Sequence, residues 1–151
     1  MPGTEKAKTP PQDPDKTSKL ASKKFDNSEA RKVIQKWLDG KKAALGKDYA
    51  ATQLNQVLTG GMLTQWKERS NYYKQNKVHR KLQHNLSVKS VIVDSDNPNI
   101  ATVEAEVTED AQHYQAEKLN QSQSYNDNLR VRYKLIKKDG SWLINHSELV
   151  N

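Results

Sequence analysis

The spacing of apolar residues changes once along this chain, near Asn76, and this change limits the folds open to it. Before that point apolar residues recur every three or four positions, which is the period of an α-helix with one buried face. After it they recur at every second position, the period of a strand with one buried face. A chain whose helices all precede its antiparallel strands is typical of an α+β domain.

Three helices are predicted in the first half. The first begins at Asp26, because Glu29 follows three residues later as in a capping box, and Gly46 suits its end. A shorter helix covers Ala50–Leu58, and a third runs over Met62–Gln75. The residues predicted on their buried faces are Ala30, Val33, Ile34, Trp37, Leu38, Ala44, Leu45, Leu54, Val57, Leu58, Met62, Leu63, Trp66 and Tyr73.

Four long strands are predicted in the second half. Residues 94–99 form a turn, Asp139-Gly140 is a hairpin signal, and the polar stretch 109–124 is expected to be an irregular or long connection. The predicted inward positions are Val78, Leu82, Leu86, Val88, Ile92, Ala101, Val103, Ala105, Val107, Leu129, Val131, Tyr133, Leu135, Trp142, Ile144 and His146. We expect one domain over residues 25–151, with three helices on one side of a curved four-stranded antiparallel sheet.

Residues 1–24 differ from the rest, because they are rich in Pro, Lys, Thr and Ser and have no apolar periodicity. Such a segment cannot bury enough surface to offset its ordering entropy, so it is predicted to be a disordered linker or leader, or a tail without a role. It carries a formal charge of +3, whereas residues 25–81 carry +7 and residues 82–151 carry −3. Most of the positive charge is therefore expected on the helices.

The residue types argue against several kinds of chemistry. The absence of cysteine removes disulfides, thiolate nucleophiles and Cys-ligated metals, and no Gly-rich phosphate loop or G-x-S-x-G motif is present. His84 and His146 have no evident inward carboxylate partner, since Glu104 and Glu106 fall on the outward positions. We therefore expect neither an enzyme nor a cofactor or metal site.

Polar residues interrupt the inner face of the predicted sheet at Arg80, His84, Ser90 and His146. Arg80 and His84 project to the same side, where a cationic pair could hold the terminal carboxylate of a peptide by charge-assisted hydrogen bonds. The alternative is that the strand passes beyond the helices into water at these positions. Together with two tyrosines, the candidate partner-binding residues are Arg80, His84, Ser90, Tyr133, His146 and Tyr73.

An ordered series of short motifs resembles the C-terminal domain of the chloroplast and cyanobacterial division proteins of the accumulation-and-replication-of-chloroplasts type. The series includes Trp37, Lys42-Ala43, Gly46, Leu54, Val57-Leu58, Met62-Leu63, Trp66, Leu86–Val91, Ala101–Ala105, Arg132-Tyr133 and Gly140–Ile144. The resemblance implies a cone-shaped fold related to nuclear transport factor two. It also implies a domain that follows a transmembrane helix, lies on the extracytoplasmic side and grips the C-terminal tail of a protein partner.

Two rival functions stay open. The Lys-rich helices could bind nucleic acid through salt-dependent phosphate contacts, or the anionic surface of a membrane. A small-ligand-binding or enzymatic member of the same fold is a further alternative. Lysines beside a membrane helix favour the cytoplasmic side, whereas the resemblance favours the periplasm or an intermembrane space.

Overall fold

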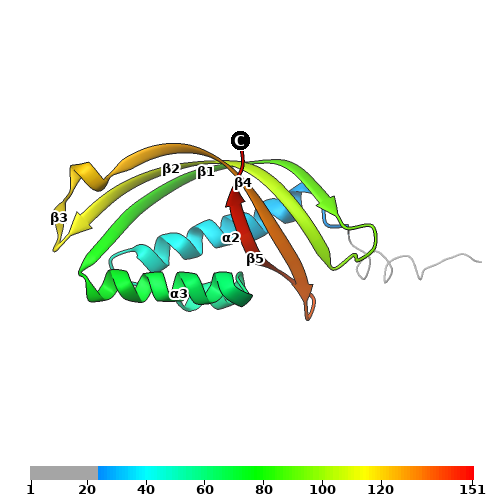
Figure 1. The fold of residues 1–151 in the computed structure, drawn as a ribbon, viewed down its shortest axis with the longest axis horizontal. Coiled ribbons are helices and arrows are strands. Elements are labelled where there is room, and N and C mark those ends of the chain that lie inside the picture. Colours follow the sequence, from blue (N-terminus) through cyan, green and yellow to red (C-terminus); the bar gives the residue numbers. More distant parts are fainter. Residues whose placement is uncertain (1–23) are drawn as a thin grey trace, which may run out of the picture.

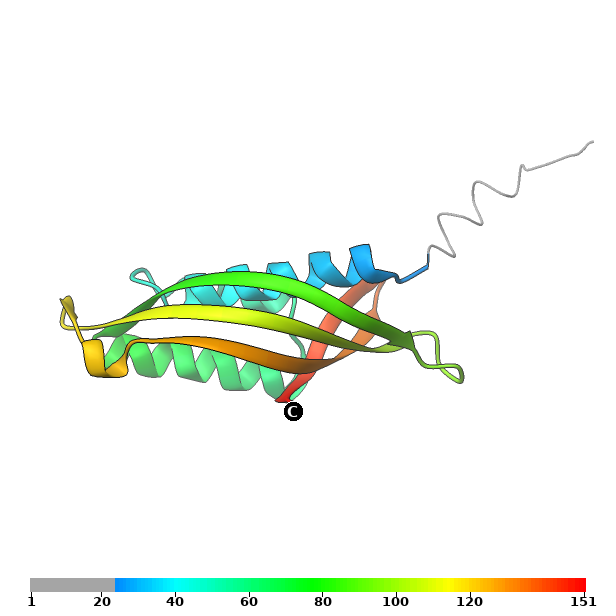
Figure 2. The same ribbon diagram turned by 90° about the horizontal axis from the view of Figure 1, so that it is seen from above.

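The computed structural model describes residues 24–151, so the predicted linker over residues 1–24 lies outside the described residues except for its last residue. Figure 1 shows the α-helices beneath an arched sheet, and Figure 2 shows the same sheet from above, with its long strands running along the helices. The helices are α2 (Asn27–Leu45) and α3 (Gly60–Gln75), joined through the 3₁₀ helix η1 (Thr52–Gln56). The α+β class predicted from the change of period is confirmed.

The first helix begins and ends at the predicted residues. The carboxylate of Asp26 accepts a hydrogen bond of 3.0 Å from the backbone N–H of Glu29, which caps α2 at its first turn. Gly46 caps the other end, where a Cβ atom would lie only 2.8 Å from the carbonyl oxygen of Lys42. The space beside that carbonyl, rather than a left-handed backbone, therefore requires glycine.

The prediction of a second α-helix over Ala50–Leu58 was wrong, because this segment forms only the short 3₁₀ helix η1. A competing contact with the sheet accounts for the difference. The backbone N–H of Ile144 donates to the carbonyl of Val57 at 2.8 Å, and the N–H of Thr59 donates to the carbonyl of Ile144 at 3.0 Å. The chain after η1 thus pairs with a strand instead of continuing as a helix, and two α-helices cover the sheet rather than three.

The sheet is an antiparallel meander in the order β1 (Val78–Val93), β2 (Ile100–Gln115), β4 (Tyr125–Lys138) and β5 (Ser141–Leu149). The two-residue strand β3 (Lys118–Leu119) pairs with the end of β2, and the short 3₁₀ helix η2 (Gln121–Gln123) follows it. The β4–β5 turn at Asp139-Gly140 has positive φ at both residues, as its sequence predicts. The four predicted strands are confirmed, with one small addition.

The predicted connection over residues 109–124 was wrong in its first half. Strand β2 continues to Gln115, and its alternation of buried and exposed residues continues with it: Glu109, Ala111 and His113 are buried. The high polarity of this stretch concealed a period of two that was still present. This extension brings a carboxylate onto the inner face of the sheet.

Two bulges move predicted inward residues to the outer face. In β1 the register shifts between Val88 and Ser90, so that Ser90 pairs with the outward Glu104 and Ile92 is 64% exposed. In β5 the register shifts at Asn145, so that His146 pairs with the exposed Lys134. The predicted inward placement of these residues was wrong, because one extra residue in a strand reverses the facing of every residue after it.

The buried residues fall into two clusters along the inner face. The larger one is apolar, includes Ile34, Leu54 and Ile144, and reaches Phe25, whose ring stacks on Trp142 with centroids 4.3 Å apart. The smaller one contains Leu45, Tyr73, Val78, Leu82 and Ala111 near the ends of α2 and α3. We call these the apolar end and the polar end of the core, since buried charged groups accompany only the second.

Candidate functional site

The polar end of the core contains six interacting side chains that we call the polar cluster: Lys41, Arg80, His84, Glu109, His113 and Tyr125. They come from four elements, with Lys41 on α2, Arg80 and His84 on β1, Glu109 and His113 on β2, and Tyr125 at the start of β4. Of the residues predicted from the sequence, the structure brings Arg80, His84 and Tyr73 together here.

Glu109 is the centre of the polar cluster. Its Oε1 lies 2.7 Å from Nζ of Lys41 and 2.8 Å from Nε2 of His84, and the hydroxyl of Tyr125 donates to its Oε2. The carboxylate is only 5% exposed, as is expected of a buried charge that is paired and hydrogen-bonded on both oxygens. His84 therefore does have an inward carboxylate partner, contrary to the prediction.

The surroundings of Glu109 keep it ionised. Burial by itself raises the pKa of a carboxyl group, but the hydrogen bonds from His84, Lys41 and Tyr125 and the positive charge of Lys41 outweigh that effect. The net result is a pKa of Glu109 well below its usual value. Burial raises the pKa of Tyr125, and its hydrogen bond to the carboxylate of Glu109 raises it further.

Arg80 lies between two aromatic rings and beside a histidine. Its guanidinium carbon is 5.6 Å from the ring centre of Tyr73 and 5.3 Å from that of Tyr125. Its Nε donates to Nδ1 of His113 at 3.1 Å, and its Nη1 donates to the hydroxyl of Tyr125 at 3.3 Å. Burial, with help from the charge of Arg80, lowers the pKa of His113. A neutral His113 is the form that can accept this bond.

The remaining candidates lie apart from the cluster. Tyr133 is 2% exposed in the apolar end, where burial raises the pKa of its hydroxyl and Trp37 forms a side-chain hydrogen bond with it. Ser90 and His146 lie on the outer face, and Nε2 of His146 is 3.5 Å from the carboxylate of Glu148. The six predicted residues thus occupy three separate places.

Sequence reasoning missed Lys41, Glu109, His113 and Tyr125. The inward alternation of Ala101 to Val107, extended by two and by six residues, would have placed Glu109 and His113 on the inner face. Lys41 had no comparable signal, because its position beside Glu109 depends on how α2 crosses the sheet. From the sequence alone, a lysine on a basic helix is predicted to be solvent-exposed, because the packing of the helix against the sheet is not known.

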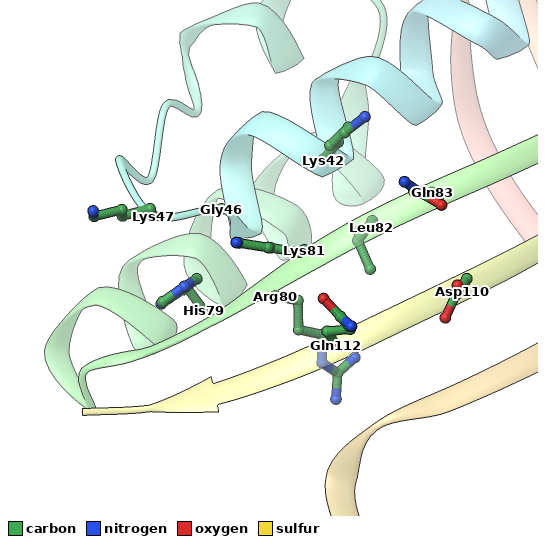
Figure 3. A pocket seen from close by; sticks show the side chains of 10 residues that line it. All are labelled: Lys42, Gly46, Lys47, His79, Arg80, Lys81, Leu82, Gln83, Asp110 and Gln112. Carbon is green, nitrogen blue, oxygen red and sulfur yellow. The ribbon is translucent and has the colours of Figure 1, made fainter. Parts of the chain in front are cut away.

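A groove of about 400 Å³ lies next to the polar end, between the C-terminal end of α2 and β1. Figure 3 shows Lys42, Lys47 and Lys81 arranged around the turn at Gly46, where α2 ends beside the strand. A neighbouring hollow shares Lys47 and His79 with this groove and adds Lys74 and Lys77. Figure 3 also shows Arg80 and Leu82 directed behind the sheet, away from the lysines.

The hydrogen bonds of Glu109 lie inside the protein. Its Oε1 is bonded to Lys41 and His84, and its Oε2 to Tyr125. Within residues 24–151 no group of three His, Cys, Asp or Glu side chains has the arrangement of a metal site. In the same range no helix has the length and apolar character needed to cross a bilayer.

Comparisons with known proteins identify relatives of this arrangement. The family model described as "ARC6-like, IMS domain" matches residues 30–145, more than half of the chain. The crystal structure of the intermembrane space region of the chloroplast protein ARC6 is similar with a TM-score of 0.76 and 27% sequence identity, covering 83% of this chain and 96% of that one.

More distant structures include a protein from Catenulispora acidiphila, at 14% identity and a TM-score of 0.49, which covers 82% of this chain and 91% of that one. A variant of a protein designated Rd1NTF2_05 is 16% identical with a TM-score of 0.44, covering 82% and 98%. Likenesses of this degree carry no argument, so the cone-shaped relation to nuclear transport factor two stays a prediction. No protein of curated function matches the chain.

Proposed function

The chain belongs to the family of ARC6-like intermembrane-space domains, and on that premise we propose that it is a non-catalytic protein-interaction domain. Its partner is a peptide or C-terminal tail of another protein, and its role is in a membrane-anchored, division-type protein. The observation that carries this proposal is the likeness to the intermembrane space region of ARC6, which extends over 96% of that region. The match therefore covers nearly all of that relative's region rather than a shared fragment.

The placement of the described chain is compatible with a tethered binding domain. The described residues begin beside Phe25 at the N-terminal end of α2, whereas the groove lies at Gly46, beyond the other end. A helix of 19 residues separates these points by roughly 28 Å, at 1.5 Å a residue. We propose that the domain lies on the extracytoplasmic side of a membrane, because its relative is the intermembrane space region of ARC6.

The polar cluster supports a non-catalytic role. The carboxylate of Glu109 is paired inside the protein with Lys41 and His84. Such a network fixes the spacing between α2 and the sheet, and hence the width of the groove beside it. We propose that Arg80, His84 and Tyr73 act in binding through this support, while Ser90 and His146 offer a separate contact on the outer face.

The test is calorimetric titration of the purified domain with synthetic C-terminal tails of the membrane-bound division proteins from the same organism. We expect saturable, stoichiometric binding of one tail and no binding of its scrambled sequence. The absence of binding to every tail would overturn the proposed function.

Alanine variants then locate the contact. Arg80→Ala and His84→Ala test the inner residues, and Ser90→Ala with His146→Ala serves as a matched outer-face variant. Each variant is first checked by circular dichroism for an unchanged fold. Unchanged binding in all of them would reject these residues and leave the function standing on the wild-type titration.

The lysine-rich surface favours a second candidate, electrostatic binding to nucleic acid or to an anionic membrane. Lys42, Lys47, Lys74 and Lys77 lie close to one another at the ends of the two helices. Binding by such a surface falls steeply with salt. Affinity for duplex DNA or for vesicles that stays unchanged from 50 mM to 300 mM salt would rule this candidate out.

A further inference from the structure

The outer face of the sheet carries an array of polar side chains beside the end of α2. The even-numbered Leu82 of β1 belongs to the core, so the odd-numbered residues around it point to the outer face. Three of these residues lie beside three outward residues of β2 in the pairs His79–Tyr114, Lys81–Gln112 and Gln83–Asp110. All of them except Tyr114 line the groove at Gly46, together with Lys42 and Lys47 (Figure 3).

His79 is the one buried side chain of this array. The residue is 7% exposed, and its ring stacks on that of Tyr114 with centroids 4.9 Å apart and an angle of 2° between the planes. It lines both the groove and the neighbouring hollow. Neither ring nitrogen forms a hydrogen bond with any residue in the range 24–151. Because an unpartnered buried polar group costs free energy, these nitrogens need a partner that enters through the groove.

Three lysines from three segments surround the same groove. Lys42 lies on α2, Lys47 follows that helix, and Lys81 lies on β1. None of the three forms an ion pair with a described carboxylate, whereas Lys41 and Lys89 are each paired with a glutamate. Ammonium groups that approach from different directions can each bond a different oxygen of one anion.

The charges that face His79 show that the potential in the groove is positive. Burial lowers the pKa of His79, and the charges of Lys47 and Lys81 lower it further, against an opposing effect of Glu117. His79 in turn lowers the pKa of the buried His113 on the neighbouring strand. His79 is therefore neutral at pH 7, with one nitrogen that donates a hydrogen bond and one that accepts.

The far end of the groove has a different chemistry. Gln83, Gln112 and Asp110 are exposed, and their side chains form no hydrogen bond with any residue that the structure describes. A carboxylate only accepts hydrogen bonds, and an amide both accepts and donates, so these groups suit hydroxyls. Asp110, together with Asp48 and Glu117 at the neighbouring hollow, would repel an extended polyanion such as nucleic acid or a lipid surface.

We propose that this groove binds the phosphate monoester of a sugar or nucleoside. The phosphate lies among Lys42, Lys47 and Lys81 and accepts a hydrogen bond from His79, while hydroxyl groups of the ligand bond to Asp110 and the two glutamines. The volume of about 400 Å³ is in the range of small-molecule sites. This inference goes beyond the proposed function and does not depend on it, because its ligand is a small molecule rather than a protein tail.

Nuclear magnetic resonance titration of the isotope-labelled domain tests the inference. The probes are glucose 6-phosphate and adenosine monophosphate, with inorganic phosphate and glucose as controls, at a fixed ionic strength of about 150 mM. We expect both esters to bind about tenfold more tightly than inorganic phosphate, since their hydroxyls add hydrogen bonds, and glucose alone not to bind. The ring signals of His79 should shift, while those of the exposed His146 should not. Saturation with an ester should raise the pKa of His79, because the phosphate charge favours the protonated ring.

Two sets of variants separate the parts of the site. Lys47→Gln with Lys81→Gln should weaken binding of the esters about tenfold, whereas the matched pair Lys67→Gln with Lys134→Gln, at exposed positions elsewhere, should change it less than about twofold. Asp110→Ala should weaken binding of the esters about fivefold without weakening that of inorganic phosphate, because only the hydroxyl contact is lost.

Several results would overturn the inference. These are esters that bind no more tightly than inorganic phosphate, equal losses in the two lysine pairs, and no shift of the His79 ring at about 10 mM of either ester. Tighter binding of duplex DNA or of phosphatidylglycerol vesicles than of the esters would assign the lysines to a polyanion instead. Titrations with division-protein tails are independent of all these outcomes, so the proposed function and this site can fail separately.

Discussion

The helices and the sheet contact each other through different side chains at the two ends of the core. At the apolar end, Ile34, Leu54 and Ile144 fill the space between the helices and the sheet, with no accessible surface. At the polar end, the same two layers meet through Glu109 and its three hydrogen-bond donors. Close packing tolerates few departures from one arrangement, whereas a charged network depends on the protonation of its members. The first end should therefore set stability, and the second should make it sensitive to pH.

The largest effect is expected at the apolar end. Ile34→Ala removes a fully buried side chain from the middle of α2 and should lower the free energy of unfolding by about 3–4 kcal/mol. Since no charge is involved, the loss should be the same at pH 4 and pH 7. Urea denaturation followed by circular dichroism measures it, with the partly buried Val33→Ala as a milder control. A loss below about 1 kcal/mol would mean that this end is loosely packed.

A smaller effect is expected from the centre of the polar end. Glu109→Gln keeps the shape of the side chain but leaves the ammonium of Lys41 without its counter-charge. We expect a loss of about 2–3 kcal/mol at pH 7, the range found for hydrogen bonds to charged groups. The same denaturation experiment checks this value. A neutral or stabilising outcome would show that the network contributes no net stability.

The dependence of stability on pH distinguishes the apolar end from the polar end more clearly than the stability of either variant at a single pH. The folded protein lowers the pKa of Glu109, so its stabilising contribution is complete above the ordinary value of 4.5 and is lost as the pH falls below it. The folded protein also lowers the pKa values of His79 and His113. As the pH falls below 6.5 these histidines bind protons more readily in the unfolded state, so the free energy of unfolding decreases.

Wild-type protein should therefore lose stability in two stages on acidification, while Glu109→Gln should lose it only in the first. Thermal unfolding between pH 3 and pH 8 records both curves, and they should approach each other below pH 4.5. Ile34→Ala serves as the control, because its curve should run parallel to the wild type throughout. Curves for Glu109→Gln and wild type that stay parallel to pH 3 would contradict the assignment of the lower stage to Glu109.

The same contrast explains which features could be predicted from the sequence. The apolar end could be predicted. Ile34, Val103 and Leu135 each belong to an apolar series with the period of their helix or strand, and burial follows from that period. The polar end could be predicted only in part. Arg80 and His84 were placed correctly, but Glu109 was assigned to a connection because its neighbours are polar. The predictions for Ser90 and His146 were wrong for another reason. A bulge adds one residue to a strand without any signal in the composition, and every later residue of that strand then points to the opposite face.

The smallest expected effects come from two tyrosines that bond to acceptors of different charge. Tyr125 donates to the carboxylate of Glu109, whereas Tyr49 donates to the neutral carbonyl of Val78. Bonds to charged groups contribute more than bonds to neutral ones, so Tyr125→Phe should cost about 1.5 kcal/mol and Tyr49→Phe about 1 kcal/mol or less. Both substitutions keep the ring, so packing changes little and the comparison isolates the hydroxyl.

A double-mutant cycle makes this last comparison decisive. In the Glu109→Gln background the cost of Tyr125→Phe should fall, because its charged acceptor is gone, while the cost of Tyr49→Phe should not change. Additive costs for Tyr125 and Glu109 would mean that the two side chains do not act as a unit, although they are bonded. The polar end would then consist of independent contacts, and its pH dependence could not be assigned to one cooperative network.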